Sequence, residues 1–216
     1  MNNKHSFFKR NGLLIVFLTT MILALSGQAY TGWHEHNEER LTENLHELVF
    51  SDYLASGHFI QTTFENWESE FLQMGLYVFL TVFLYQKGSA ESKSLDEPEE
   101  VDREPISYPE APWPVKKGGW YLTVYKNSRS LVFSLLFVAS FIGHAYGTMQ
   151  NINEEEQKTL TLWQTILENR FWFESFQNWQ SEFLSIAAIV YFSIYLRQKG
   201  SPESKPVDSP HDETGK

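Results

Sequence analysis

The sequence predicts an all-α protein: a four-helix transmembrane bundle made by tandem, parallel duplication of a two-span unit. Four apolar blocks alternate with charged segments, and aromatic residues make up 16% of the chain, which is high for a soluble domain. The motif "NWESEFLQ" at residue 66 recurs as "NWQSEFLS" at residue 178. Each motif is followed by an apolar stretch and then by "QKGSAESK" or "QKGSPESK". Aligning residues 64–93 with 176–205 gives 16 identities in 30 positions, so we treat the chain as two sequence repeats.

The first apolar block, residues 13–30, has 18 residues without a charge, close to the ~20 that cross a bilayer as a helix. Taken alone, with Lys4, Lys9 and Arg10 before it, this block also fits a secretory signal. Its counterpart at 130–147 lies in the middle of the chain, where it cannot be a cleaved signal; "GQAY" at 27 matches "GHAY" at 143, an offset of 116. We therefore expect spans at about 13–32 and 130–148.

The second and fourth blocks, residues 71–86 and 183–198, are related by an offset of 112. About 16 residues is short for a span, and a buried helix of a soluble protein is the alternative. Extending each helix back through Trp67 or Trp179 restores roughly 20 residues and places a Trp at the headgroup level. We expect these spans at about 67–87 and 179–198. Trp67, Trp179, Lys87 and Lys199 would then be interface anchors.

The basic residues predict the topology. Residues 1–12, 87–130 and 197–216 hold 14 of the 17 Lys and Arg residues, so both termini and the central linker should face the cytoplasm. We expect repeats at 1–93 and 120–205, a disordered linker rich in Pro and acids at 94–119, and a disordered tail at 206–216. Apolar positions in the two outer loops predict short amphipathic helices there.

Composition excludes several classes of function. Without cysteine the chain has no disulfides and no thiolate sites, and its net charge of −10 argues against a nucleic-acid partner. It carries no nucleophile elbow, phosphate-binding glycine loop or zinc-protease helix. We expect no enzymatic activity, no catalytic residues and no cofactor.

The repeated motif supplies one pair of candidate carboxylates, Glu70 and Glu182. Each would sit about one turn inside the outer boundary, where an ionisable group is costly and therefore a functional candidate. They could share a proton or hold a cation across the repeat axis. The alternative, which we favour, is polar contact between helices. The polar neighbours that belong to this candidate site are Asn66, Asn178, Ser69 and Ser181.

The outer loop of the first repeat contains "HEH" at 34–36, which offers imidazoles suited to zinc or copper. His34 and His36 do not share a helical face, and the second repeat has Gln150 and Ile152 there, so we expect solvated loop residues and no metal site. Small residues at Gly27, Gly143 and Gly147 predict close helix packing. His144, which stands where the first repeat has Gln28, should bond across helices.

The motifs "NWxSEFL" and "QKGSxESK" resemble those of a bacterial family of small integral membrane proteins catalogued as a domain of unknown function, family 6766. The resemblance covers nearly the whole chain. It implies a multi-pass protein of the bacterial cytoplasmic (inner) membrane without an assigned activity, and it brings no catalytic residues.

Three hypotheses for function follow. The leading one is a non-enzymatic structural or accessory membrane protein. The second is a small proton- or cation-handling protein that uses the Glu70/Glu182 pair, and the third is an outward-facing metal-binding module that uses the loop histidines. Expected partners are the lipid bilayer, a second copy of the chain, and a cytoplasmic protein that binds the QKGSxESK tags.

Overall fold

The computed structural model describes residues 6–215, and this range is helical without any strand. Four long helices account for most of it: α1 (Phe7–Thr42), α3 (Gly57–Leu80), α6 (Ser128–Glu155) and α8 (Asn169–Tyr195). The short elements are α2 (Phe50–Tyr53), η1 (Glu100–Asp102), α4 (Trp113–Lys117), α5 (Gly119–Lys126) and α7 (Leu162–Ile166). The predicted all-α class is confirmed.

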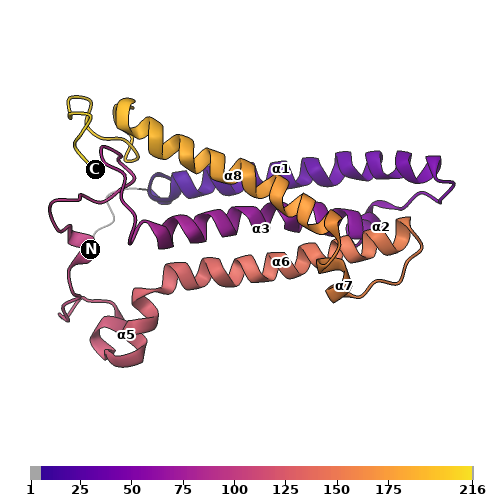
Figure 1. Cartoon of the computed structure of the whole chain (residues 1–216), viewed down its shortest axis with the longest axis horizontal. Coiled ribbons are helices and arrows are strands. Elements are labelled where there is room, and N and C mark those ends of the chain that lie inside the picture. Colours follow the sequence, from indigo (N-terminus) through magenta and orange to yellow (C-terminus); the bar gives the residue numbers. More distant parts are fainter. Residues whose placement is uncertain (1–5, 216) are drawn as a thin grey trace.

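The long helices run side by side, and the short elements gather at the two ends of the bundle (Figure 1). The segments that carry α2 and α7 lie at one end, which we call the loop end. The linker, α5 and the C-terminal tail lie at the other, which we call the linker end.

Helices α3 and α8 begin ten residues before Trp67 and Trp179 respectively, so both tryptophans lie inside a helix. The hydroxyl of Ser56 accepts a hydrogen bond from the N–H of Phe59 and caps the start of α3. Helix α3 ends at Leu80, seven residues before the expected end of the span. At this end the Thr81 side chain donates to carbonyl oxygens of its own last turn, at Tyr77 and Val78.

Helix α3 is the centre of the bundle and packs against both α6 and α8. It crosses α6 closely because Gly143 and Gly147 lack side chains. A Cβ at Gly143 would lie 2.6 Å from the Phe64 ring, and one at Gly147 would overlap the backbone of Gln61. The predicted packing role of these two glycines therefore agrees with the structure, whereas Gly27 on α1 has no such neighbour within 4 Å.

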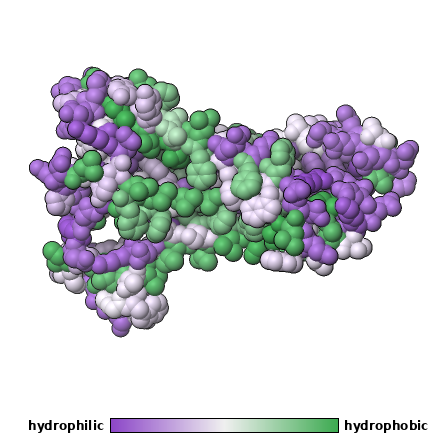
Figure 2. Space-filling view, in the orientation of Figure 1, coloured by the Kyte–Doolittle hydropathy of each residue, from purple (hydrophilic) through white to green (hydrophobic). Residues whose placement is uncertain are grey.

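Helices α1 and α6 are long and apolar enough to cross a membrane, as judged by length and composition. The space-filling view shows apolar residues gathered in a band across the middle, with hydrophilic residues concentrated toward both ends (Figure 2). The N-terminal half of α1 contributes exposed apolar side chains, among them Leu13, Phe17 and Leu23. This distribution fits an apolar surrounding around the middle of the bundle.

The same pair of hydrogen bonds closes the loop at the loop end of each repeat. The Asn37 side chain exchanges two hydrogen bonds with the backbone of Leu48, at 2.8 and 3.0 Å. The Asn153 side chain does the same with Leu160, at 2.7 and 3.1 Å. Asn153 lies 116 residues after Asn37, and Leu160 lies 112 residues after Leu48. The second repeat is therefore four residues shorter between its Asn and its Leu than the first repeat is.

The QKGSxESK tags also fold alike. In the first tag the backbone N–H of Gln86 donates to the Ser92 hydroxyl at 2.9 Å, and in the second Gln198 donates to Ser204 at 2.9 Å. Two of the matching serines thus hold the turn that follows each helix. These serines therefore have a local structural role in both tags.

The two segments that the sequence predicts to be disordered carry structure within the described residues. The linker segment 94–119 contains η1 and α4. The tail is joined to the first tag through the buried Lys205, whose ammonium donates to four backbone carbonyl oxygens, those of Gly88, Pro210, His211 and Glu213.

Candidate functional site

A cluster of ionisable side chains is buried between α3, α6 and α8 toward the loop end. Its centre is His144 of α6, whose side chain is fully buried. The Phe171 ring of α8 stacks on the imidazole with 4.5 Å between centroids. The small residue Gly147, one turn further along α6, lets α3 approach closely enough to present its carboxylates to this ring.

Both imidazole nitrogens of His144 face carboxylates. Nδ1 lies 2.8 Å from Oε2 of Glu68, which is itself fully buried, and Nε2 lies 3.3 Å from Oε2 of Glu174. A third carboxylate, that of Glu65, lies 3.8 Å from Nε2. Glu65 and Glu68 come from α3 and Glu174 from α8, so the imidazole joins three helices.

The remaining contacts hold the carboxylates in place. The Trp179 indole donates to Oε1 of Glu68 at 3.0 Å, and the Arg170 guanidinium donates to Oε1 of Glu174 at 3.0 Å. Burial opposes ionisation of Glu174, but hydrogen bonds from His144 and Arg170 outweigh it and hold the pKa of Glu174 below its ordinary value. Burial raises the pKa of Glu65, although His144 acts in the opposite direction.

This arrangement is suited to holding a proton. An imidazole donates from both nitrogens only when it carries both ring protons, and here each nitrogen faces a carboxylate oxygen that accepts. Three carboxylates face the imidazole, and one of them, that of Glu174, also binds the Arg170 guanidinium. The cluster can therefore bind one more proton or release one, and burial favours the protonated form of Glu65.

The predicted carboxylate pair lies elsewhere. Glu70 of α3 and Glu182 of α8 come within hydrogen-bonding reach of each other, so the structure brings these two residues together. Their predicted polar neighbours bond within their own helices, and Asn178 also bonds the Glu65 side chain of the His144 cluster. Asn66 and Asn178 donate to carbonyl oxygens four residues earlier, and the Ser69 and Ser181 hydroxyls to carbonyl oxygens three residues earlier.

The predicted interface anchors differ in their exposure. Lys87 and Lys199 are exposed at the linker end, and Trp67 is 38% exposed. Trp179 instead turns inward, toward Glu68.

The two histidines of "HEH" lie in different surroundings. His34 is exposed and contacts the Tyr30 and Trp33 rings, whereas His36 is buried and stacks on His58 of α3. The expectation that both are solvated is therefore wrong for His36. The carboxylate of Glu39 lies 3.8 Å from His36, and these three residues bring metal-type donor atoms within 4.8 Å of one another.

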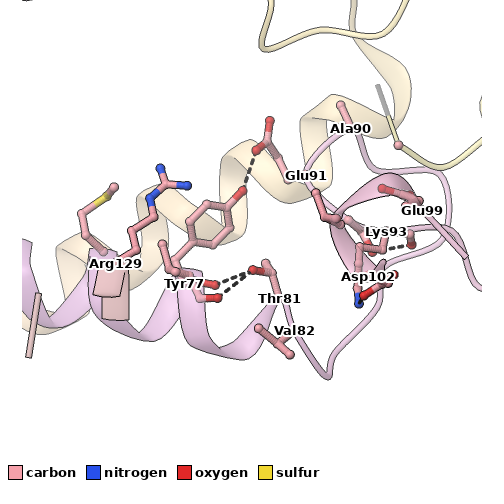
Figure 3. Close-up of a pocket in the computed structure, with 14 residues that line it drawn as sticks. Tyr77, Thr81, Val82, Ala90, Glu91, Lys93, Glu99, Asp102 and Arg129 are labelled. Carbon is pink, nitrogen blue, oxygen red and sulfur yellow. Dashed lines mark hydrogen bonds and ion pairs between the residues drawn. The ribbon is translucent and has the colours of Figure 1, made fainter. Parts of the chain in front are cut away.

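A separate cavity of about 590 Å³ opens at the linker end, beside the first tag (Figure 3). The Tyr77 hydroxyl donates to Glu91 at 2.5 Å, and Lys93 pairs with Asp102 at 2.6 Å along its wall. These four side chains bind each other, and the lining also holds Glu99 and Arg129.

Sequence reasoning identified His144 but missed its partners. The signal that could have found them is a charge difference between the repeats. Glu68 stands opposite Gln180 inside the repeated motif, and Glu174 stands opposite Thr62 just before it. Because a duplicated structural role needs no such difference, an unmatched acid inside a matched helix is a candidate for a special contact.

The fold and the site define an all-helical protein with two helices able to span a membrane and a buried cluster of ionisable groups between its helices. The family model "Domain of unknown function (DUF6766)" matches residues 4–216, and the chain belongs to this family. Searches of curated proteins and of solved structures found no match.

Proposed function

We propose that the chain is a non-enzymatic, multi-pass membrane protein whose His144 cluster binds and releases a proton, so that pH sets how α3, α6 and α8 pack. The observation that carries this proposal is the fully buried imidazole with a carboxylate on each ring nitrogen. A buried charge network of this kind is more sensitive to the gain or loss of one proton than an exposed one, because few waters screen it.

The membrane arrangement in this proposal is four spans. Helices α3 and α8 would join α1 and α6, with both repeats entering in the same orientation and both termini in the cytoplasm of a bacterium. The distribution of Lys and Arg supports this orientation. The His144 cluster would then lie toward the outer face of the cytoplasmic membrane and respond to the pH outside the cell. The lipid bilayer is the proposed partner, and the absence of catalytic motifs from the sequence supports a non-enzymatic role.

The test records the protonation of His144 and the response of its surroundings together. In protein labelled with ¹⁵N at histidine and tryptophan and held in lipid nanodiscs, NMR follows the His144 ring nitrogens and the Trp179 indole N–H across pH. We expect both to change over the same pH range, since Trp179 donates to Glu68 and Glu68 contacts His144. The variant His144→Gln identifies the histidine signal and should leave the Trp179 signal unchanged with pH.

Trp67 is the matched control, because it occupies the same motif position in the first repeat but lies on the surface. Its indole signal should not follow the His144 transition. A His144 signal without a transition between about pH 4 and pH 10, or a Trp179 response that persists in His144→Gln, would contradict the proposal.

The pair Glu70/Glu182 is the second candidate for proton binding, because these two carboxylates lie within hydrogen-bonding reach. The double variant Glu70→Gln/Glu182→Gln separates the two sites in the same experiment. If the Trp179 response disappears in this variant and persists in His144→Gln, the proton-binding site is the Glu70/Glu182 pair.

A further inference from the structure

The imidazole of His36 is a buried polar group outside the His144 cluster. Its residue is 6% exposed, and both of its ring nitrogens lack a hydrogen-bond partner among the described residues. A buried polar atom without a partner is unfavourable, so such groups in folded proteins usually have a further role. In the neutral ring one nitrogen carries the N–H and the other a lone pair, and a metal ion accepts that lone pair.

Two further donors lie beside His36. The His58 ring stacks on it with 4.6 Å between centroids, and the Glu39 carboxylate reaches to 3.8 Å from Nδ1. The Tyr53 hydroxyl, almost fully buried, lies 3.2 Å from Nδ1 of His58, which leaves Nε2 of that ring for another partner. A hydrogen bond on the second nitrogen is what typically orients a metal-binding histidine.

The equivalent positions of the second repeat hold different side chains. Arg170 stands at the position of His58, Glu155 at that of Glu39 and Ile152 at that of His36. The Arg170 guanidinium binds the Glu155 carboxylate at 2.6 Å. The second repeat thus fills the place with a cation of its own and an apolar side chain, whereas the first repeat has two imidazoles beside the equivalent carboxylate.

We propose that His36, Glu39 and His58 bind a divalent transition-metal ion of the zinc type. Two imidazole nitrogens and one carboxylate oxygen form a three-ligand set that zinc accepts, with water in the fourth position. Burial, and then the neighbouring His36, lower the pKa of His58, and the neutral ring is the form that binds metals. The ion would occupy the place that the guanidinium takes in the second repeat.

The stacked rings define the movement that binding requires. Their planes are inclined by 13°, and an ion bound by both rings must lie close to the plane of each. At least one ring must therefore rotate about its Cβ–Cγ bond. No hydrogen bond holds the His36 ring in its present orientation. Glu43, Glu154 and Glu155 line the adjacent cavity together with Arg40. Arg40 pairs with Glu154 and Arg170 with Glu155, so the Glu39 and Glu43 carboxylates are the groups that favour a cation here.

The test is isothermal titration of the purified, metal-stripped chain in detergent with ZnCl₂. Thermal unfolding is measured in parallel. We expect one ion per chain and a rise in Tm of about 5–10 °C at a hundredfold excess over Kd. The variants take their residues from the second repeat: His36→Ile and His58→Arg should each weaken zinc binding by tenfold or more and abolish the rise in Tm.

His34→Gln is the matched control, because residue 150 is also Gln and His34 lies outside the cluster. It should bind zinc as the wild type does. Without metal, His36→Ile should unfold no earlier than the wild type, since it removes two unsatisfied nitrogens, and this separates loss of binding from loss of fold. The proposal is overturned if the wild type binds no zinc, if all four proteins bind equally, or if only His34→Gln loses binding.

Discussion

Gln28 and His144, 116 residues apart, reach matching positions on the helix that follows each of them. Gln28 Nε2 lies 3.3 Å from the Thr62 hydroxyl, and His144 Nε2 lies 3.3 Å from the carboxylate of Glu174, which is 112 residues after Thr62. One repeat makes this contact with neutral groups and the other with ionisable groups. The neutral version therefore shows how the site can be converted without changing its place in the fold.

We predict that His144→Gln destabilises the protein by about 3 kcal/mol, because Glu68 then remains buried without a cationic partner and Glu174 keeps only Arg170. The double variant His144→Gln/Glu174→Thr reproduces the neutral contact of the first repeat and should recover part of this loss. Thermal or denaturant unfolding in detergent measures both. A double variant that is less stable than His144→Gln alone would show that the two contacts are not equivalent.

The Glu65 carboxyl group should make stability depend on pH. Burial raises its pKa above the ordinary 4.5, so the folded state binds the proton more tightly than the unfolded state. The stabilisation from this group is complete below pH 4.5 and is lost as the pH rises through the folded-state pKa. Glu65→Gln, which stays neutral, should not lose it. The stability difference between variant and wild type should consequently grow in favour of the variant above pH 4.5, and a constant difference from pH 4 to 9 would refute this assignment.

Gly147→Ala should separate α3 from α6, since its new Cβ would overlap the backbone of Gln61. Overpacking of this kind costs about 1–3 kcal/mol. Gly27→Ala is the control, because nothing lies within 4 Å of its Cβ. Helix propensity alone should make that variant neutral or slightly more stable. Equal destabilisation by the two substitutions, measured by thermal unfolding, would exclude the α3–α6 crossing as the cause.

Asn37→Ala and Asn153→Ala should each loosen one loop, because each removes two hydrogen bonds to the backbone of the loop that follows. We expect a loss of about 1–2 kcal/mol for each variant. Hydrogen exchange should become faster at the Leu48 amide in the first variant and at the Leu160 amide in the second. Asn11→Ala, which removes one exposed bond within α1, should change neither amide.

Lys205→Met should release the C-terminal tail, since the Lys205 ammonium donates to carbonyl oxygens on both sides of the contact between tail and first tag. Amide exchange at Gly88 and Gly215 should become faster, because both N–H groups bond across this contact. Lys93→Met changes the corresponding lysine of the first tag, which pairs with Asp102 instead. An unchanged tail in Lys205→Met would mean that the remaining backbone bonds hold it.

The helical class and the repeated architecture could be predicted from the sequence, because apolar periodicity and repeated motifs are local properties. An alignment of the two repeats also shows the glycines of α6 and the replacement of Gln28 by His144. The helix ends were less predictable. Helix α3 begins after Ser56 and ends before Thr81, whose side chains bond to nearby backbone groups, and neither end coincides with a limit of the apolar block.

Only the tertiary structure decided which residues meet. His144 finds Glu68 across 76 residues of chain and Glu174 across 30, and His36 finds His58 on another helix. The sequence by itself determined that these groups are polar and lie on helices. Which of them share a face depends on the rotation and height of each helix, and close packing at Gly143 and Gly147 sets both for α3 and α6. That information is distributed over contacts far apart in the chain, and no local pattern carries it.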